Sequence, residues 1–408
     1  MKVETPGGRP VKTLLFSTLY PSSVRPLHGI FVETRLRELL KTGQVMTRVV
    51  APVPWFPSTD ARFGDYARIA STPEHETRHG ILVDHPSYPL IPKLGLSTAP
   101  LFLAAASIAP LRRVLAEGFD FDVIDAHFYY PDGVAAALLG RYFGKPVAVT
   151  ARGTDLNLYP AHTVPRWWMQ WAAHRIEASI GVCGALVDVL RRWSVESDRL
   201  HVMRNGVDLV RFHPVPPDEA RQRLGQEGAP LLLSVGHLIE RKGHHLAIDA
   251  LARLRSTHPQ ARLMVVGDGE ERQSLHALAR RMDLTDAVHF AGAVPNEKLA
   301  DYYAAADATF LASSREGWAN VLLESMACGT PVVATRIWGT PEVVASPQAG
   351  VLVDERSGPA LAEGVLKLLA AYPARADVRS YAEGFSWAQT SQAQLDLFRS
   401  LSRRAANP

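Results

Sequence analysis

The chain has 408 residues, of which 47% are hydrophobic and 21% are charged. This composition is that of a globular protein with about two to three domains, and it excludes a largely disordered chain. The net charge of +3 is too small to predict a nucleic-acid partner. Cys183 and Cys328 have small or apolar neighbours, so we expect buried free thiols rather than disulfides or metal ligands.

Apolar runs and helical patterns alternate in the first half of the chain. The predicted strands cover 11–17, 45–51, 123–126 and 147–150, and the predicted helices cover 31–41 and 133–143. Strands that alternate with helices form a parallel sheet with helices on both faces. The first half is therefore predicted to be an α/β domain of this kind.

Two segments of the first half are candidates for contact with a membrane. Residues 94–111 carry no charge, but the run is marginal against the about 20 apolar residues that a span needs, so we predict a buried or interfacial helix. Trp167, Trp168 and Trp171 lie beside Arg166 on a helix that either packs in the core or meets a membrane interface. The N-terminus lacks the pattern of a secretory signal. We expect a cytoplasmic protein with, at most, peripheral contact at the inner face of the plasma membrane.

The same alternation restarts after the Pro-rich stretch 214–217. Predicted strands cover 231–235, 262–266, 288–290, 308–311, 332–334 and 351–352, and predicted helices cover 244–255, 271–281, 298–305, 320–327, 341–344 and 389–401. We therefore expect one domain at 1–213, a second at 214–385, and a final helix and tail at 386–408. Because ligands bind at the carboxyl ends of parallel strands, the default site is a cleft between the two sheets.

The segment Glu316-Gly-Trp-Ala-Asn-Val-Leu-Leu-Glu324 is the strongest candidate site. It leads from a strand into a helix, whose free N–H groups and positive dipole end suit phosphate or sugar oxygens. Eight helical residues would rise about 12 Å, roughly the span of a sugar nucleotide from hexose to ribose. One carboxylate could then reach each end of such a ligand. Two ordinary surface glutamates are the alternative, which the glycine and the flanking strands disfavour.

This segment resembles the mark of glycosyltransferase family 4, and SMACGTPVVATRIWGTPEVV after it is also similar to that family. With HGIFVETRLREL near the start, the chain looks most like bacterial cell-wall and exopolysaccharide enzymes of the teichuronic-acid-biosynthesis type. The resemblance implies a GT-B fold, with two Rossmann-like domains and a C-terminal helix that crosses back to the first. It implies retaining transfer of a hexose from a UDP- or GDP-sugar to a saccharide, often lipid-linked, acceptor. It also places Glu316 at the donor sugar and Glu324 on the ribose hydroxyls, with Trp318, Ala319, Asn320 and Val321 lining the donor.

The loop Ser234–Gly243 is the candidate for the diphosphate. A lysine there can neutralise a leaving phosphate. Family members usually carry an Arg after the first glycine of this loop and a Lys five residues later. Lys242 matches the second position, whereas His237 replaces the Arg, and Arg241 is a candidate to compensate. Two further loops resemble nucleotide-contacting loops of the family, one at Gly267 and one at Val294, where backbone rather than side chains meets the base.

Candidate residues of the first half lie at predicted strand ends and helix starts. His127 ends a strand, and the resemblance implies that it reaches the transferred sugar and the acceptor. Arg152 stands where the family usually has a His, before Asp155. Because Arg is a permanent bidentate donor, this pair suggests an anionic sugar or acceptor. Gly29 resembles the loop that approaches the diphosphate, with a simple helix-entry turn as its alternative.

No cofactor or metal is expected. Asp120-Phe-Asp122 is a D-x-D string, but it precedes a strand of the first domain, away from the predicted donor loops. Two other functions remain open at this point: a non-hydrolysing sugar-nucleotide epimerase on the same architecture, which the paired glutamates disfavour, and a catalytically silent nucleotide-binding scaffold.

Overall fold

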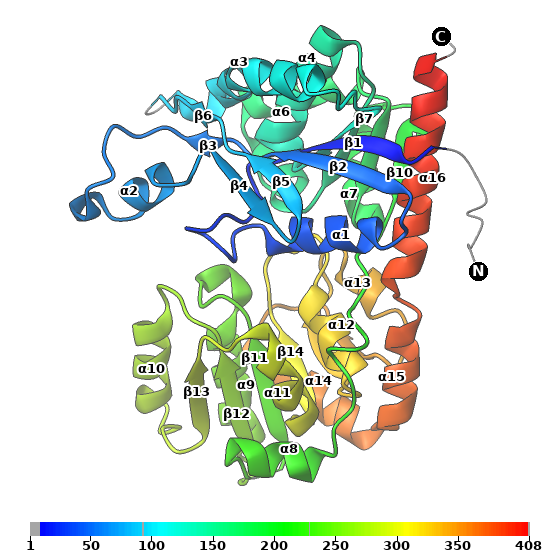
Figure 1. The fold of residues 1–408 in the computed structure, drawn as a ribbon. Helices are drawn as coiled ribbons and strands as arrows, with labels where there is room; N and C mark the ends of the chain where they lie inside the picture. Colours follow the sequence, from blue (N-terminus) through cyan, green and yellow to red (C-terminus); the bar gives the residue numbers. More distant parts are fainter. Residues whose placement is uncertain (1–8, 92–93, 228, 407–408) are drawn as a thin grey trace. The chain divides into compact units, whose positions relative to one another are not determined.

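The computed structural model describes residues 9–91, 94–227 and 229–406. The chain divides into two compact units: unit 1 comprises Met1–Met203 and Ala388–Pro408, and unit 2 comprises Arg204–Trp387 (Figure 1). The predicted boundary after residue 213 lies further along the chain than this division. The reason is that Arg204 and Asn205 already belong to unit 2, where they bond to Glu342 and Asn320.

Unit 1 contains an eight-stranded sheet in the order β10-β9-β8-β7-β1-β2-β5-β4, in which only β4 is antiparallel. The strands are β1 Val11–Phe16, β2 Val45–Val50, β4 His75–Arg78, β5 Ile81–Asp84, β7 Val123–His127, β8 Val147–Ala151, β9 Ala178–Gly181 and β10 Leu200–Val202. A separate pair joins β3 Val53–Pro54 to β6 Ser87–Tyr88. The four strands predicted for this half are confirmed to within a residue at each end, because central parallel strands are buried on both faces and read as unbroken apolar runs.

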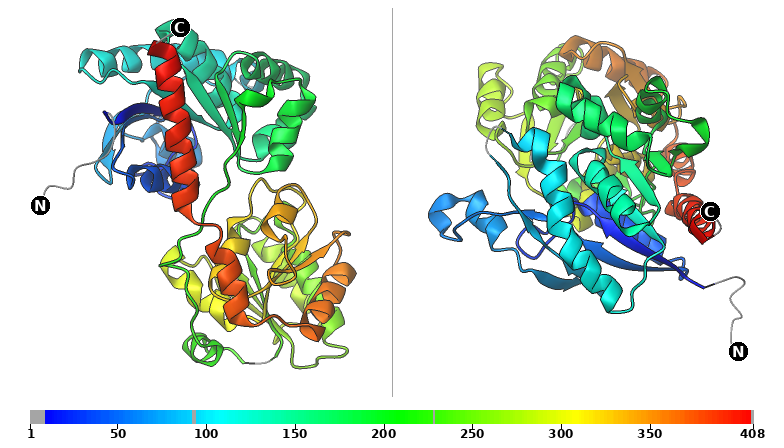
Figure 2. Two further views of the ribbon diagram at one scale, coloured as in Figure 1. Left: turned by 90° about the vertical axis from the view of Figure 1, so that its right-hand side faces the viewer. Right: turned by 90° about the horizontal axis from the view of Figure 1, so that it is seen from above.

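Helices cover both faces of this sheet. They are α1 Ile30–Leu40, α2 Asp65–Ala70, α3 Gly95–Ala116, α4 Val134–Phe143, α5 Thr154–Asn157, α6 Thr163–Ala173, α7 Gly184–Arg192 and α16 Trp387–Ala406, with short helical turns η1 Ala61–Phe63, η2 Tyr129–Gly133, η3 Tyr159–Ala161 and η4 Ser197–Arg199. Helix α16 packs Leu395, Phe398 and Leu401 against β-strand residues such as Val123 (Figure 2). The predicted return of the C-terminal helix to the first domain is therefore confirmed.

The two membrane candidates form the helices α3 and α6. Helix α3 is long and apolar enough to span a membrane by length and composition, and 39% of its most apolar window is buried in the protein. Helix α6 has two different faces: Met169 and Ala172 are fully buried, whereas Trp167 is 56% exposed. The core interpretation thus holds for one face of α6, and the other face is open to solvent.

Unit 2 contains a six-stranded parallel sheet in the order β13-β12-β11-β14-β15-β16. Its strands are β11 Leu231–Val235, β12 Arg262–Val266, β13 Val288–Gly292, β14 Ala308–Leu311, β15 Val332–Thr335 and β16 Gly350–Val353. Its helices are α8 Pro217–Leu224, α9 His244–Leu254, α10 Arg272–Arg281, α11 Leu299–Ala305, α12 Asn320–Ala327, α13 Thr340–Val343, α14 Gly358–Ala370 and α15 Arg375–Glu383, with turns η5 Glu240–Lys242 and η6 Asn296–Lys298. The strand order is that of the Rossmann fold. The sequence patterns did not predict α8, α14 or α15.

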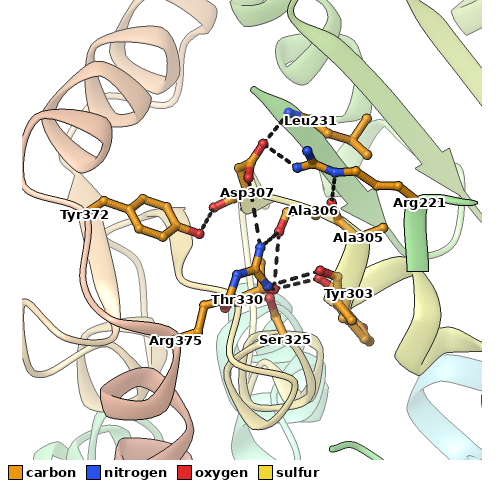
Figure 3. A network of polar contacts seen from close by, with 11 residues as sticks. Arg221, Leu231, Tyr303, Ala305, Ala306, Asp307, Ser325, Thr330, Tyr372 and Arg375 are labelled. Atoms are coloured by element: carbon orange, nitrogen blue, oxygen red, sulfur yellow. Dashed lines mark hydrogen bonds and ion pairs between the residues drawn. The ribbon is translucent and has the colours of Figure 1, made fainter. Parts of the chain in front are cut away.

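A polar network around Asp307 joins the amino ends of β11 and β14 (Figure 3). Its carboxylate accepts hydrogen bonds from Arg221 at 2.8 Å and from the backbone N–H of Leu231 at 2.7 Å. Arg375 lies 3.9 Å away and bonds to the Thr330 hydroxyl at 2.9 Å. The Asp307 carboxylate thus links α8 and α15 to the amino ends of the strands.

We expect Asp307→Ala to lower the free energy of unfolding by about 2–3 kcal/mol, because Arg221 and the Leu231 N–H lose their acceptor in a mostly buried setting. Urea unfolding followed by circular dichroism measures this. Glu363→Ala, which removes the exposed Lys367–Glu363 pair of α14, should change stability by about 0.5 kcal/mol or less. Equal effects of the two variants would contradict the assigned role of Asp307.

Candidate functional site

Each sheet has a topological switch point, where the chain order reverses. In unit 2 the reversal falls between β11 and β14, and in unit 1 between β1 and β7. Ligands of open parallel sheets bind outside the carboxyl ends of the strands at such points. The loops that follow β11, β14 and β1 carry Lys242, Glu316 and Gly29, and His127 is the last residue of β7. The structure therefore brings the sequence candidates to the switch point of each unit.

Lys242 and Glu316 meet at the switch point of unit 2. Lys242 Nζ lies 2.6 Å from Glu316 Oε1, and the Ser313 hydroxyl donates to the same oxygen at 2.7 Å. The contact depends on Gly243, which has φ +74° and whose added Cβ would lie 2.3 Å from the backbone oxygen of Ala312. The two side chains are only 18% and 10% exposed, so this ion pair is poorly screened by water.

Arg241 supports the same loop contact from the side. Its Nη1 donates to the backbone oxygen of Arg315 at 2.7 Å and lies 3.7 Å from Glu316 Oε1. Its own carbonyl accepts from the N–H of Ser314 at 2.9 Å. The side chain of His237 is exposed, while its carbonyl accepts from Ile239. Arg241 is thus a second cation at Glu316.

The rise expected between the two glutamates is wrong, because α12 begins only at Asn320. Residues 317–319 form a loop, and residues 320–324 account for about 6 Å of helical rise. In the loop, Trp318 and Ala319 are 7% and 3% exposed. The indole ring of Trp318 lies 6.0 Å from the ring of Phe385 and within 5.9 Å of the Arg204 guanidinium. These two predicted donor contacts are largely packed inside unit 2, whereas Asn320 and Val321 are half-buried.

Glu324 lies on α12 and is fixed from behind. The hydroxyl of Tyr303 donates to Glu324 Oε2 at 2.8 Å, and Tyr303 itself is fully buried. Burial raises the pKa of Glu324, against the hydrogen bond from Tyr303 and the charge of Arg211. One carboxylate oxygen is therefore committed to the protein, which orients the other.

The two predicted backbone loops lie at the same edge of the sheet. Gly267 follows β12, and its N–H donates to the carbonyl of Gly292 at 2.8 Å. Val294 follows β13 and is half-buried. The N–H of Leu238 donates to the carbonyl of Asp268 at 2.9 Å, so the loops after β11 and β12 are bonded to each other. These bonds hold the loops after β11, β12 and β13 together beside Lys242.

In unit 1, both ring nitrogens of His127 are engaged within the protein. Nε2 lies 3.2 Å from Asp125 Oδ2, and Nδ1 lies 2.8 Å from Arg152 Nη2. A guanidinium only donates, so Nδ1 is the acceptor and Nε2 carries the proton. Burial lowers the pKa of His127 to about 4, and the charge of Asp125 opposes this shift only in part. The imidazole is therefore neutral at pH 7 and 1% exposed.

Asp125 connects this histidine to the C-terminal helix. Gln394 of α16 donates from Nε2 to Asp125 Oδ2 at 3.1 Å. Its other end, Oε1, accepts from Arg35 Nε at 2.8 Å, and Arg35 Nη1 bonds to the carbonyl of Met203 at 3.0 Å. A buried polar chain thus runs from α16 through Asp125 and His127 to Arg152.

Arg152 and Asp155, predicted as an anion site, have different environments. The Arg152 guanidinium is half-buried and lies 5.4 Å from the ring of Phe31, besides its bond to His127. Burial and the charge of Arg35 lower the pKa of Arg152 to about 9, so it stays cationic at neutral pH. Asp155 is fully buried and accepts from the backbone N–H groups of Tyr129, Arg152 and Gly153. Asp155 therefore shapes the loop that presents Arg152.

Gly29 is a buried helix-entry residue. It has φ +68° and precedes α1, and an added Cβ would lie 2.2 Å from the carbonyl oxygen of Leu19. Only glycine fits such an approach of two backbone segments. The structure shows a helix-entry turn at this position, and the approach of Gly29 to a diphosphate stays a prediction.

Four residues of these networks did not emerge from sequence patterns: Asp132, His244, Tyr303 and Gln394. Asp132 accepts from the N–H and hydroxyl of Thr18, which fixes the loop after β1, and burial raises its pKa to about 7. His244 bonds to the Ser234 hydroxyl at 2.8 Å and to the carbonyl of His237. Burial lowers the pKa of His244 to about 4. A polar residue at a buried position of a helix or strand is the one signal that could have marked them.

The Asp120–Asp122 string is used in ion pairs. Asp122 pairs with Arg9 at 2.6 Å, and Asp120 pairs with Lys145 at 2.5 Å. Among the described residues, no group of three His, Cys, Asp or Glu side chains is arranged to hold a metal ion.

Solved structures of similar shape identify the class of fold. Sucrose-phosphate synthase from Thermosynechococcus elongatus superposes with a TM-score of 0.75 at 21% identity, over 96% of this chain and 99% of that chain. HepE of Anabaena, solved in complex with UDP, has a TM-score of 0.69 at 21% identity, over 96% and 100%. The protein has the GT-B fold of glycosyltransferases.

Sequence comparison identifies the family. The model for glycosyl transferases group 1 matches residues 217–385, and that for Glycosyltransferase Family 4 matches 62–211. The provisionally assigned teichuronic acid biosynthesis glycosyltransferase TuaC of Bacillus subtilis is 30% identical over 88% of this chain and 89% of its own length. A D-inositol 3-phosphate glycosyltransferase of Acidothermus cellulolyticus is 32% identical over 74% and 72%. The chain belongs to glycosyltransferase family 4, and it is a glycosyltransferase enzyme.

The two neutral buried histidines predict a loss of stability in mild acid. Their pKa is lowered in the folded state, so the unfolded chain binds more protons than the folded chain below about pH 6.5. At pH 4, each histidine therefore lowers the free energy of unfolding by on the order of 3 kcal/mol. The contribution of the two neutral histidines to the free energy of unfolding is fully present above about pH 6.5 and falls as the pH drops towards about 4. Urea unfolding at half-unit pH steps measures it.

We expect His127→Gln and His244→Gln each to flatten this dependence in its own unit. His289→Gln, at an exposed position of β13, serves as the matched control. An unchanged slope in both buried-site variants would contradict the assignment of neutral histidines.

Proposed function

We propose that the protein transfers a hexose from a UDP- or GDP-sugar to a saccharide acceptor, with retention of the anomeric configuration and without a metal ion. The observation that carries this proposal is the Lys242–Glu316 pair at the switch point of unit 2, flanked by Glu324 and the loops of Gly267 and Val294. The UDP complexes of HepE and the TuaC name support a nucleotide donor and a role in polysaccharide assembly.

The donor would take over contacts that unit 2 now makes internally. Lys242 and Arg241 face the diphosphate, and Lys242 exchanges its bond to Glu316 for one to a phosphate oxygen. Glu316, with Ser313 still donating to it, then accepts from hydroxyls of the sugar. Glu324 binds the ribose hydroxyls through the oxygen that Tyr303 does not occupy. Each carboxylate is thus held by one protein donor while it receives the ligand.

In the reaction, the bond from the anomeric carbon to the diphosphate oxygen breaks first, and the nucleoside diphosphate leaves with the electron pair. The acceptor hydroxyl attacks the same face of the sugar, and its proton passes to the departing phosphate oxygen. Lys242 stabilises the charge that develops on the leaving group, which is the role of a preorganised cation. This route needs no protein nucleophile.

His127 acts on this reaction through Arg152. Since Arg152 and Asp125 occupy both of its nitrogens, we assign His127 to positioning and Arg152 to contact with the substrate. A guanidinium half-buried beside a neutral imidazole suits a carboxylate or phosphate group. We therefore propose an anionic group on the transferred sugar or on the acceptor.

A lipid-linked acceptor would bring the protein to the inner membrane surface, and unit 1 has a face that suits this. Helices α3, α4 and α6 contact one another and contain four arginines and no Asp or Glu. Trp167 and Leu101 are 56% and 45% exposed there, and Trp167 and Trp171 line a hollow of about 420 Å³. Exposed aromatic and basic side chains favour an anionic interface.

Lys242→Ala should reduce kcat by about 10²- to 10³-fold, which is about 2.7–4 kcal/mol of transition-state stabilisation, as the loss of a preorganised donor does. The assay offers UDP- and GDP-sugars with and without a membrane lipid extract. Lys367→Ala on α14 is the control, since that lysine is 65% exposed. Full transfer by Glu316→Ala would overturn the site assignment, isomerisation without an acceptor would indicate an epimerase, and nucleotide binding without turnover would indicate a scaffold.

Arg152→Gln should raise KM for a uronate- or phosphate-bearing substrate by roughly tenfold or more, because a charge-assisted bond is lost. The KM of a neutral analogue should change by about threefold or less. Arg192→Gln, at an exposed arginine of α7, is the matched control. Equal losses on charged and neutral substrates would contradict an anion-binding role.

A further inference from the structure

A small lobe of unit 1 carries several exposed aromatic side chains. The aromatic lobe, defined here as residues 55–70, runs from the end of β3 through η1 to the end of α2, and it projects beyond the sheet in Figure 1. Trp55, Phe63 and Tyr66 are 59%, 42% and 67% exposed. In soluble proteins, rings of this size in one exposed group mark a contact surface.

The rings are ordered by one another. The ring of Phe56 lies 5.4 Å from that of Tyr66 at an interplanar angle of 27°, and 5.4 Å from that of Phe63 at 65°. Within α2, Ala67 is the buried residue, and the N–H of Trp55 bonds to the carbonyl of Tyr88 at 2.8 Å. The lobe is thus held through its backbone and Ala67, which leaves Trp55, Phe63 and Tyr66 exposed.

The lobe lies at the edge of the sheet where ligands bind. It follows β2 and β3, and the carboxyl end of β2 lies at the same edge as those of β1 and β7. It also adjoins the loop before Gly29: burial and the charge of Arg68 in α2 lower the pKa of Arg25, which bonds to His28 at 2.6 Å. The aromatic faces are therefore neighbours of the loop at the switch point of unit 1.

The charges of the lobe cancel. Arg62 pairs with Asp60 at 3.0 Å, and Arg68 pairs with Asp65 at 2.8 Å, so residues 55–70 have no net charge. An anionic lipid surface attracts basic segments, and the arginine-bearing face of α3, α4 and α6 fits it better. Neutral aromatic faces with a few polar groups at their rim suit the apolar faces of sugar rings.

We propose that the aromatic lobe binds the acceptor saccharide, by stacking Trp55, Phe63 and Tyr66 against sugar units remote from the attacking hydroxyl. This inference rests on the proposed function, because it concerns the acceptor of the same reaction. It implies that the acceptor is an oligosaccharide. Binding energy from remote units then holds the acceptor in place, while the donor site is unaffected.

The test compares wild type with the double variant Trp55→Ala/Tyr66→Ala. The probes are malto-oligosaccharides and chondroitin oligosaccharides of one to six sugar units, with binding followed by saturation-transfer NMR on the full chain. We expect wild type to bind the longer members of one series more tightly, and the double variant to lose roughly tenfold or more of that affinity. Binding of the single sugar and of UDP should be unchanged.

Tyr142→Ala is the matched control, because Tyr142 is 52% exposed at the end of α4, at the opposite edge of the sheet. Circular dichroism checks that the variants are folded. The proposal is overturned if wild type shows no length dependence, if the double variant keeps it, or if the double variant instead loses binding to phosphatidylglycerol vesicles. Where transfer can be assayed, the double variant should raise acceptor KM with donor KM unchanged. Failure of wild type to transfer any sugar would instead count against the proposed function.

Discussion

Desolvation is the constraint on which the candidate residues of each unit depend. A charge or polar group removed from water must find a partner, and each candidate group here has found one within its own unit. Glu316 is held by Lys242 and Ser313, and Glu324 by Tyr303. The same groups would have to exchange or share these partners with a ligand. The side chains of Glu316 and Glu324 are thus fixed by contacts within the protein.

The central groups of the two units differ in charge. At the switch point of unit 2, a cation and a carboxylate form an ion pair, which a diphosphate can compete for. At the switch point of unit 1, the central group is a neutral imidazole, wedged between the Asp125 carboxylate and the Arg152 guanidinium. These two bonds fix the tautomer of His127, and the bond to His127 fixes the orientation of the Arg152 guanidinium. The anionic substrate and the nucleotide donor that we propose would thus bind to separate cations.

The central strands of the unit 1 sheet and the strands of the unit 2 sheet could be predicted from the sequence, because central parallel strands are continuous apolar runs and their ends carry glycine and charged residues. Lys242 and Glu316 were found in this way. The partners that fix the site could not, since they are brought together by tertiary packing alone. Gln394 and Asp125 are 269 positions apart. The helical spacing places Gln394 on the same face of α16 as Phe398 and Leu401, but nothing in the sequence pairs it with Asp125. The direction of the Arg152 and His127 side chains is likewise a product of packing.

The return of α16 to unit 1 has a consequence for biosynthesis. A ribosome makes the first segment of unit 1 before unit 2 and the segment from Ala388 after it, so unit 1 lacks one of its packing elements until all of unit 2 has emerged. Domains fold as units during synthesis. Unit 2 can therefore be fully folded while unit 1 still lacks α16. The hydrophobic strip that Leu395, Phe398 and Leu401 cover, and the carboxylate that Gln394 bonds, are open to the solvent or to a chaperone during that interval. Premature termination before residue 388 would therefore leave the unit that was translated first without its last helix.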